Sequence, residues 1–217
     1  MLITPESLAR LLLFMEKTAT ETYPEAPSKG HDEVTLRAME YLFANFRLPS
    51  SAGILDVGCG QGVALRPFQE RGHKPVGITL NGTDAKVCCT LGFDVRVMDQ
   101  SFLDFGDASF DLVWARHVIE HSFMPYYTLT EFRRVLRPGG VLYLEVPSPD
   151  TLGHERNQNH YSVMGKSMWE SLIGRSGFTC AGTIDYHVST EEGRSDCYWG
   201  LFALATPSGD SASAGFP

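Results

Sequence analysis

The sequence predicts an α/β fold in which a mostly parallel sheet of seven strands carries helices on both faces. Apolar runs typical of buried strands alternate with helical stretches from residue 54 to residue 146. Gly58, Gly60 and Gly62 link the first of these runs to a helix. The turn signal at residues 137–140, Arg-Pro-Gly-Gly, separates the last helix of this alternation from its strand. Together these observations indicate repeated strand–helix units.

Two helices are predicted before the sheet begins. Thr4-Pro5-Glu6 is typical of an N-cap followed by proline at the first helical position, and the helix should run to about Thr18. A turn-rich stretch, 23–30, leads to a second helix over about 32–46. We expect residues 1–48 to form an N-terminal helical cover that packs over the mouth of the ligand site.

Residues 49–206 form the predicted core, which makes a single domain with the cover. Its strands are expected at 54–57, 75–79, 94–98, 110–115, 141–146, 179–188 and 196–206. Its helices are expected at 63–71, 83–91, 125–136 and 166–176. The long segment 147–166 lacks periodicity, which is typical of a lid or binding loop. Residues 207–217 are expected to be a disordered tail.

Charge and composition narrow the classes of partner. The formal net charge of −8 disfavours polyphosphate chains, so we expect no nucleic-acid partner. The apolar stretch near the N-terminus, Leu11–Met15, is too short to span a bilayer, and we find no secretion signal, so we expect no membrane association. The five cysteines are odd in number and lack C-x-x-C spacing, which is typical of reduced thiols in a cytoplasmic protein.

The glycine loop after the first strand predicts a backbone that binds an anionic group. A strand that turns through glycines into a helix exposes N–H groups at the helix N-terminus. A dinucleotide fingerprint would need a further glycine at position 63, where Val63 stands. Asp56, just before the loop, adds an acceptor for an amino group. A ligand with an amine and a carboxylate therefore fits better than a pyrophosphate.

The stretch Ile54-Leu55-Asp56-Val57-Gly58-Cys59-Gly60-Gln61-Gly62 resembles the first motif of class I methyltransferases that use S-adenosylmethionine. The resemblance extends over four motifs, in the family's order and spacing, from about Ala52 to about Phe178. It implies a Rossmann-like sheet and S-adenosylmethionine as cofactor, with S-adenosylhomocysteine as product. We interpret the chain as a methyltransferase of the small-molecule type.

The resemblance places the cofactor against residues at the ends of successive strands. These are Asp56, Gly58, Cys59, Gly60, Thr79, Leu80, Asp99, Gln100, Ala115 and Arg116. Thr79 departs from the family, which usually has an acidic residue there to hold both ribose hydroxyls. A hydroxyl cannot offer two charged acceptors, so Asn81 or Asp84 would supply the missing contact. Asp99 would meet the adenine amino group, or it would only cap the following turn.

Four residues are candidates for contact with the methyl acceptor. His117 and His121 follow the fourth strand, and His160 and Tyr161 lie in the long loop after the fifth. The carboxyl ends of parallel strands are where ligands bind, so these side chains should face the acceptor. His117 and His160 are the candidate catalytic bases, because imidazole titrates in the right range. Packing or loop-tethering roles remain the alternative for all four.

The spacing H-x-x-E-H at His117, Glu120 and His121 also raises the possibility of a metal site. Some relatives use E-x-x-E-H to hold a divalent ion, but this chain has histidine at the first position. We therefore expect no metal ion.

The sequence thus predicts transfer of a methyl group to an oxygen or nitrogen of a small molecule. A protein or RNA methyltransferase, or a non-catalytic module that binds S-adenosylmethionine, are the alternatives. We expect a cytoplasmic monomer or homodimer. The identity of the acceptor does not follow from the sequence, because loops and added helices set it.

Overall fold

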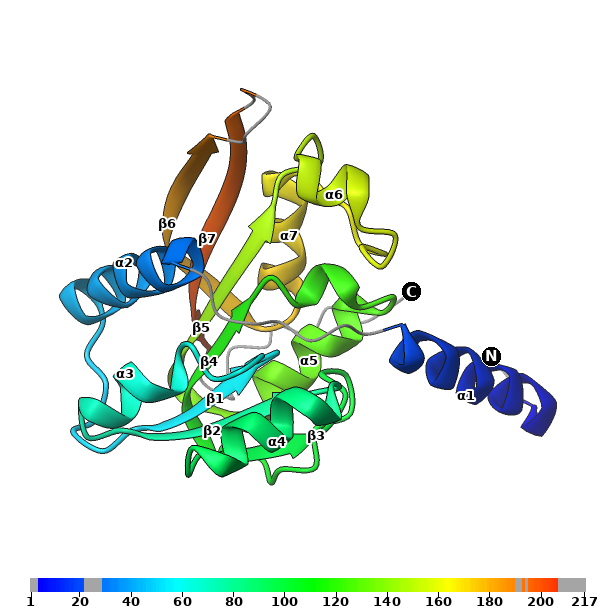
Figure 1. The fold of residues 1–217 in the computed structure, drawn as a ribbon, viewed down its shortest axis with the longest axis horizontal. Coiled ribbons are helices and arrows are strands. Elements are labelled where there is room, and N and C mark those ends of the chain that lie inside the picture. The colour runs from blue at the N-terminus through cyan, green and yellow to red at the C-terminus, as the bar shows by residue number, and fades with distance from the viewer. Residues whose placement is uncertain (1–3, 22–28, 190–192, 194, 207–217) are drawn as a thin grey trace.

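A computed structural model describes residues 4–21, 29–189, 193 and 195–206 and confirms the predicted α/β class (Figure 1). The strands are β1 (Gly53–Val57), β2 (Lys74–Thr79), β3 (Asp94–Val97), β4 (Phe110–Arg116), β5 (Leu136–Pro147), β6 (Phe178–Ser189) and β7 (Ser195–Ala205). They form one seven-stranded sheet in the order β3-β2-β1-β4-β5-β7-β6. Neighbours from β3 through to β5 pair in parallel, whereas β7 pairs antiparallel with both β5 and β6.

Helices cover both faces of this sheet. They are α1 (Pro5–Thr20), α2 (Lys29–Asn45), α3 (Leu65–Glu70), α4 (Gly82–Thr90), the 3-10 turn η1 (Ile119–His121), α5 (Pro125–Val135), α6 (Leu152–Arg156) and α7 (Lys166–Arg175). Buried residues of α5 and α7, among them Phe132 and Trp169, share one apolar cluster with alternate residues of the central strands. Within the described ranges, no helix combines the length and apolarity that crossing a membrane requires.

The opposite face is built around aromatic rings. Met39 and Leu42 of α2 are fully buried there. The ring of Trp114 on β4 packs against Phe68 of α3 and Tyr143 of β5, at centroid distances of 5.3 and 4.3 Å. Burying each such side chain contributes about 1.5–3 kcal/mol, so α2 is fixed to the sheet by its own apolar stripe.

The strand order reverses between β1 and β4, and this position fixes the site. β1 pairs with β2 on one side and with β4 on the other, so the chain crosses from β3 to β4 over the sheet. In open α/β sheets, ligands bind outside the carboxyl ends of the strands at such a reversal. The glycine loop follows β1 at this point, as the sequence predicts.

Three elements differ from the sequence-based expectation. α3 begins at Leu65 instead of Val63, because residues 61–64 complete the glycine turn first. β5 begins at Leu136, and the predicted turn at 137–140 forms an irregular stretch of that strand, where the register with β4 shifts. The long segment 147–166 contains the short helix α6.

The two N-terminal helices behave differently from each other. α2 lies against a face of the sheet and not over the mouth of the ligand site. α1 has no buried residue and extends away from the sheet (Figure 1). Only its C-terminal end reaches the site, as described below. The predicted tail 207–217 lies outside the described residues.

Candidate active site

A pocket opens at the carboxyl ends of β1, β2 and β4, where the strand order reverses. It holds about 960 Å³ of empty space when its open mouth is counted. Six residues of the predicted cofactor set line it, namely Gly58, Gly60, Thr79, Leu80, Asp99 and Gln100. Three residues of the predicted acceptor set, His117, His121 and Tyr161, line it as well. Distant parts of the sequence therefore meet at one cavity.

The glycine loop has a conformation that suits glycine. Gly58, Gly60 and Gly62 have φ angles of +67°, +48° and +87°, which side chains with a Cβ rarely adopt. A Cβ on Gly58 would lie 2.7 Å from Cγ2 of Val118, so the segment after β4 closes directly on the loop. The N–H groups of Cys59 and Gly62 donate to the carbonyl oxygens of Ile78 and Cys59, while Gly58 and Gly60 bring loop backbone to the pocket wall.

Asp56 lies at the end of β1, directly before pocket residues Val57 and Gly58. Its side chain is buried, and its Oδ2 has no hydrogen-bond partner. Burial raises the pKa of Asp56 to about 8, although the charge of Arg116 acts in the opposite direction. A buried acceptor without a donor favours a ligand that brings one.

The end of β2 shows how Thr79 is used. Its hydroxyl accepts a hydrogen bond from the backbone N–H of Asn81 at 3.1 Å. Asn81 caps α4 by accepting from the N–H groups of Thr83 and Asp84. Asp84 is buried, lines the pocket, and accepts from Gln61 at 3.0 Å. A carboxylate is therefore present in this wall of the pocket, five positions after Thr79.

Asp99 and Gln100 follow β3. Asp99 accepts a hydrogen bond from the N–H of Ser101 at 2.7 Å, so it caps the turn and also lines the pocket. Gln100 donates to the carbonyl oxygen of Val118 at 2.8 Å, while its buried Oε1 has no partner. Both residues thus offer acceptor atoms beside the apolar side chain of Met98.

Four residues of the predicted cofactor set lie outside the lining of this pocket. Asp56 and Cys59 are neighbours of lining residues, and Ala115 belongs to the apolar core. Arg116 points to the opposite side of the sheet, where its guanidinium donates to both oxygens of Glu145, at 3.0 and 2.7 Å, and to Thr35 of α2. The side chain of Arg116 thus links β4 to β5 and α2. Only the backbone of this residue could contact a ligand.

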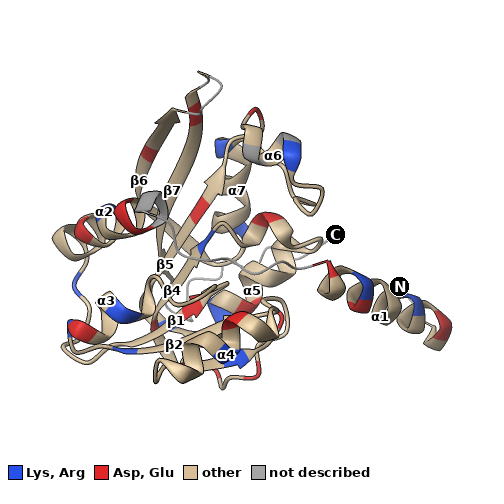
Figure 2. Cartoon of the chain, viewed as in Figure 1, with Lys and Arg blue, Asp and Glu red and all other residues tan. Residues whose placement is uncertain are grey.

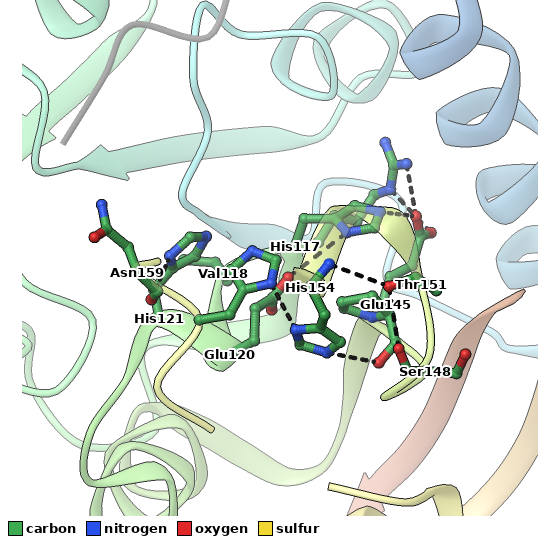
Figure 3. Close-up of polar contacts among 12 residues, drawn as sticks. His117, Val118, Glu120, His121, Glu145, Ser148, Thr151, His154 and Asn159 are labelled. Atoms are coloured by element: carbon green, nitrogen blue, oxygen red, sulfur yellow. Dashed lines mark hydrogen bonds and ion pairs between the residues drawn. The ribbon is translucent and has the colours of Figure 1, made fainter. Parts of the chain in front are cut away.

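His117 is held between two carboxylates (Figure 3). Its Nε2 lies 2.8 Å from Glu145, its Nδ1 lies 3.6 Å from Glu120, and its φ angle is +49°. Burial disfavours the charged ring, but Glu120 and Glu145 outweigh it and raise the pKa of His117 to about 9. His117 is therefore an imidazolium at neutral pH. The predicted role as a base does not suit a ring that already carries its proton and directs both nitrogens at carboxylates, whereas a fixed positive charge in the pocket wall does.

The long loop folds back onto η1. Nδ1 of His121 lies 3.0 Å from the carbonyl oxygen of Asn159, and the N–H of Ser162 donates to the carbonyl oxygen of Glu120 at 2.9 Å. The ring of His160 packs against the ring of His121, with 4.7 Å between their centroids, and His160 does not line the pocket. Burial lowers the pKa of His160 to about 4, so this ring is neutral at pH 7.

The C-terminal end of α1 closes the same side. Thr18 lines the pocket, and Phe14 makes an edge-on ring contact with Phe123 at 5.0 Å. Glu21, just after α1, accepts from the Tyr161 hydroxyl at 2.9 Å. Its carbonyl oxygen also accepts from the side chain of Asn159 at 2.9 Å.

Several site residues carried no recognisable signal in the sequence. Val118, Phe123 and Thr18 are apolar or generic, and only the fold brings them together. His154 contacts His160, with 2.6 Å between their Nδ1 atoms. A histidine six positions before His160 in an unpatterned loop was the one available hint.

Comparison with known proteins agrees with this architecture. Residues 55–144 match the family model described as a methyltransferase domain. The 27-O-demethylrifamycin SV methyltransferase of Amycolatopsis mediterranei is 29% identical over 159 residues, which cover 67% of this chain and 58% of that protein. The 2-methyl-6-phytyl-1,4-hydroquinone methyltransferase of Synechocystis sp. is 34% identical over 134 residues, which cover 59% of this chain and 39% of that protein. The chain thus spans 58% and 39% of the length of these two relatives.

Among solved structures, the 4+2 cyclase SpnF superimposes with a TM-score of 0.69 at 20% identity, covering 86% of this chain and 85% of that one. At this identity the likeness shows a shared fold and no more. The matched domain spans β1 to β5 and includes the glycine loop and the strand-order reversal. The family match, the methyltransferase relatives and the shared fold together support a class I S-adenosylmethionine-dependent methyltransferase.

Proposed function

We propose that this chain transfers the methyl group of S-adenosylmethionine to an oxygen or nitrogen of a small-molecule acceptor. The observation that carries the proposal is Asp56, a buried carboxyl whose Oδ2 has no partner, at the edge of the pocket beside the glycine loop. The amino group of the donor's methionine part would meet this acceptor. The backbone of the glycine loop, which lines the pocket at Gly58 and Gly60, suits its carboxylate.

The remaining walls fit the other parts of the donor. Asp84 and Thr79 suit the ribose hydroxyls, since together they offer a carboxylate and a hydroxyl. Asp99 and the unpartnered Oε1 of Gln100 suit the amino group of adenine. Met98 provides an apolar contact for the ring. The presence of Asp84 in this wall supports retained binding despite Thr79.

Transfer itself asks for positioning more than for acid–base chemistry. When bound, S-adenosylmethionine supplies a methyl group that its positive sulfur already activates. The residues of this chain would align the acceptor and exclude water, which supply most of the acceleration in such displacements. Tyr161 and Asn159, tied to Glu21 after α1, narrow the mouth on the acceptor side. His117, as an imidazolium fixed between Glu120 and Glu145, would place a positive charge beside the acceptor.

The distribution of charge supports a small acceptor. Lys and Arg are interspersed with Asp and Glu over the elements in Figure 2, and the net charge is −8. An RNA or a basic peptide would need a continuous charged track leading to the pocket. The two relatives described above are named for small-molecule methylation, which agrees with this class of acceptor.

Calorimetric titration of S-adenosylmethionine into the wild type and Asp56→Ala tests the donor site. We expect binding by the wild type and a loss of about 1.5–3 kcal/mol in the variant, as for hydrogen bonds to charged groups. This loss corresponds to roughly 10- to 150-fold in affinity. Asp94→Ala is the matched control, since Asp94 is an exposed aspartate on β3. Equal affinity in wild type and Asp56→Ala would remove the assignment.

Turnover is measured separately, as release of S-adenosylhomocysteine with a panel of phenols, carboxylic acids and amines. Release with one chemical class of acceptor is expected. Binding of the donor without release from any small acceptor, peptide or RNA would favour the non-catalytic module. Release only with peptide or RNA would favour the macromolecular alternative.

A further inference from the structure

Three potential ligand atoms converge beside the pocket, at a place that the predicted trio of His117, Glu120 and His121 does not describe. Glu120, His121 and His160 each place one such atom within 4.8 Å of the others. Glu120 and His121 come from η1, and His160 comes from the loop between α6 and α7. His117 is not part of this group, because its two ring nitrogens face Glu120 and Glu145.

Glu120 is the unusual member of the cluster. It is fully buried, and neither of its carboxylate oxygens has a hydrogen-bond partner. The one cation beside it in the described part of the chain, His117, lies 3.6 Å from Oε1 and makes its short contact with Glu145 instead. Burying a carboxylate in this way is costly unless a cation compensates it. His117, which Glu120 shares with Glu145, compensates Glu120 only in part, and two carboxylate oxygens without a hydrogen-bond partner remain for a further positive ligand.

The two histidines are oriented to offer lone pairs. Nδ1–H of His121 donates to the carbonyl oxygen of Asn159, which leaves Nε2 as an acceptor (Figure 3). Nε2–H of His154 donates to the carbonyl oxygen of Pro147 at 3.2 Å, so its Nδ1 accepts from Nδ1–H of His160 at 2.6 Å. Nε2 of His160 is then also free of hydrogen. Hydrogen bonds of this kind on the far nitrogen are what metal-binding histidines have in proteins.

Backbone contacts hold the two segments together. The N–H of Ser162 donates to the carbonyl oxygen of Glu120, and Asn159 binds His121 through its carbonyl oxygen. These bonds lie on either side of His160, so its ring is fixed next to His121. The cluster is thus built by the fold and does not depend on exposed, mobile side chains.

The donor set selects a class of ion. Two imidazoles and one carboxylate suit zinc and other first-row transition metals, while magnesium and calcium prefer oxygen ligands throughout. With bonds of about 2.0–2.1 Å at tetrahedral angles, two ligand atoms on one ion lie about 3.3–3.4 Å apart. Separations of up to 4.8 Å would therefore have to close by about 1.5 Å when the ion binds. His121 lines the pocket, so a position on the ion would be open toward it.

We propose that Glu120, His121 and His160 bind one divalent transition-metal ion at the edge of the acceptor side of the pocket. The site stands on its own contacts and does not rest on the methyl-transfer function proposed above. It replaces our sequence-based expectation that the chain holds no metal.

Equilibrium dialysis of tag-free, full-length protein against Zn²⁺ tests the site. We expect one Zn²⁺ per chain, with Mg²⁺ in excess failing to displace it. Glu120→Gln and His160→Asn should each weaken binding by more than about 100-fold, because even changes outside the ligand set cost roughly 10- to 100-fold. His187→Asn is the control, since this exposed histidine lies on β6, away from the cluster.

Co²⁺ gives a second readout that reports the ligand type. We expect a weak visible spectrum of a nitrogen–oxygen site in the wild type and in His187→Asn, and its loss in Glu120→Gln and His160→Asn. Circular dichroism establishes that each variant is folded. An intense near-ultraviolet thiolate band would place the ion on cysteines and overturn the proposal. Binding that survives both substitutions, or no Zn²⁺ retained at all, would overturn it as well.

Discussion

Two ionisable residues, Asp56 and His117, both hold their proton at neutral pH, which makes the first neutral and the second a cation. Asp56 is buried with little compensation, so burial dominates and raises its pKa to about 8. His117 is flanked by Glu120 and Glu145, which overcome burial and raise its pKa to about 9. Before any ligand binds, a neutral acid therefore lies next to the donor side of the pocket, and a cation lines its acceptor side.

Donor binding should release a proton from Asp56. An ammonium group favours the carboxylate, so affinity should rise with pH up to about 8, by at most about tenfold per pH unit. Calorimetry at pH 6 and pH 7.5, in buffers of different ionisation enthalpy, measures both the affinity and the proton. Asp56→Asn should bind weakly with no pH dependence. Equal wild-type affinity at both pH values, without proton release, would contradict the assignment.

The same residue affects the stability of the free protein. The unfolded carboxyl has the ordinary pKa of 3.8, so between about 4 and 8 the folded state holds a proton that the unfolded state has lost. The contribution of Asp56 therefore becomes less favourable as pH rises through this window. Thermal unfolding of Asp56→Asn should lack this component.

At the residue scale, the sequence predicts what local spacing encodes. The glycine loop and the residues that follow each strand occur in short motifs, so six of the predicted cofactor residues line the pocket. The partners of His117 and Arg116 could not be predicted, because Glu145 lies 28 and 29 positions away along the chain. Their protonation and orientation depend on pairing between strands, which one sequence does not reveal.

At the element scale, β4, β5 and α2 are joined by one buried ion pair. Arg116 and Glu145 lie opposite each other in the register of β4 and β5, and Thr35 of α2 contacts the same guanidinium. The hydroxyl of Tyr143 donates to Glu145 at 2.6 Å, and Arg116 and His117 together keep the pKa of that carboxyl well below its usual range despite burial. If Arg116 is replaced, the buried carboxylate of Glu145 loses its main compensating charge.

Arg116→Met should therefore cost about 3–5 kcal/mol in the free energy of unfolding, the usual penalty for breaking a buried pair. Arg137→Met is the control, since Arg137 binds Asp111 with nearly half of its side chain exposed, and should cost no more than about 1 kcal/mol. Denaturant unfolding measures both. The double change Arg116→Met with Glu145→Gln should recover part of the loss. Equal costs for Arg116→Met and Arg137→Met would show that the buried pair has no special weight.

Element boundaries were predictable where apolar periodicity was clear and failed where turns extended them. The strands at 54–57 and 75–79 match β1 and β2 within a residue. α3 is shorter than predicted, because the turn through Gly62 uses the residues that would have begun it. The placement of α1 and α2 relative to the pocket depends on packing against segments far along the chain, which one sequence does not reveal.

At the scale of the whole molecule, α1 is attached at one end. None of its residues is buried, and the contacts described above link its last turns and Glu21 to Phe123, Asn159 and Tyr161. The remaining fold has its own core on both sides of the sheet. Stability and ligand binding should therefore respond differently when α1 is removed.

A chain that starts at residue 22 should keep its unfolding free energy to within about 1 kcal/mol, as for changes at exposed positions. Its affinity for S-adenosylmethionine should fall, because Thr18 no longer lines the pocket and the loop loses its ties to Glu21. Thermal unfolding and calorimetry separate the two effects. Leu13→Ser serves as a control, since Leu13 is 65% exposed. A large loss of stability, or unchanged affinity, would contradict this view of α1.

The close approach of Val118 to Gly58 has a consequence for the order of events in a catalytic cycle. Val118 touches the loop after β1, its carbonyl oxygen holds Gln100, and it is the neighbour of His117. The donor side and the acceptor side of the cavity therefore contact the same residue, so binding of the first ligand should restrict the motion of the segment that binds the second. This shared contact favours ordered kinetics, in which S-adenosylmethionine binds first and S-adenosylhomocysteine dissociates last.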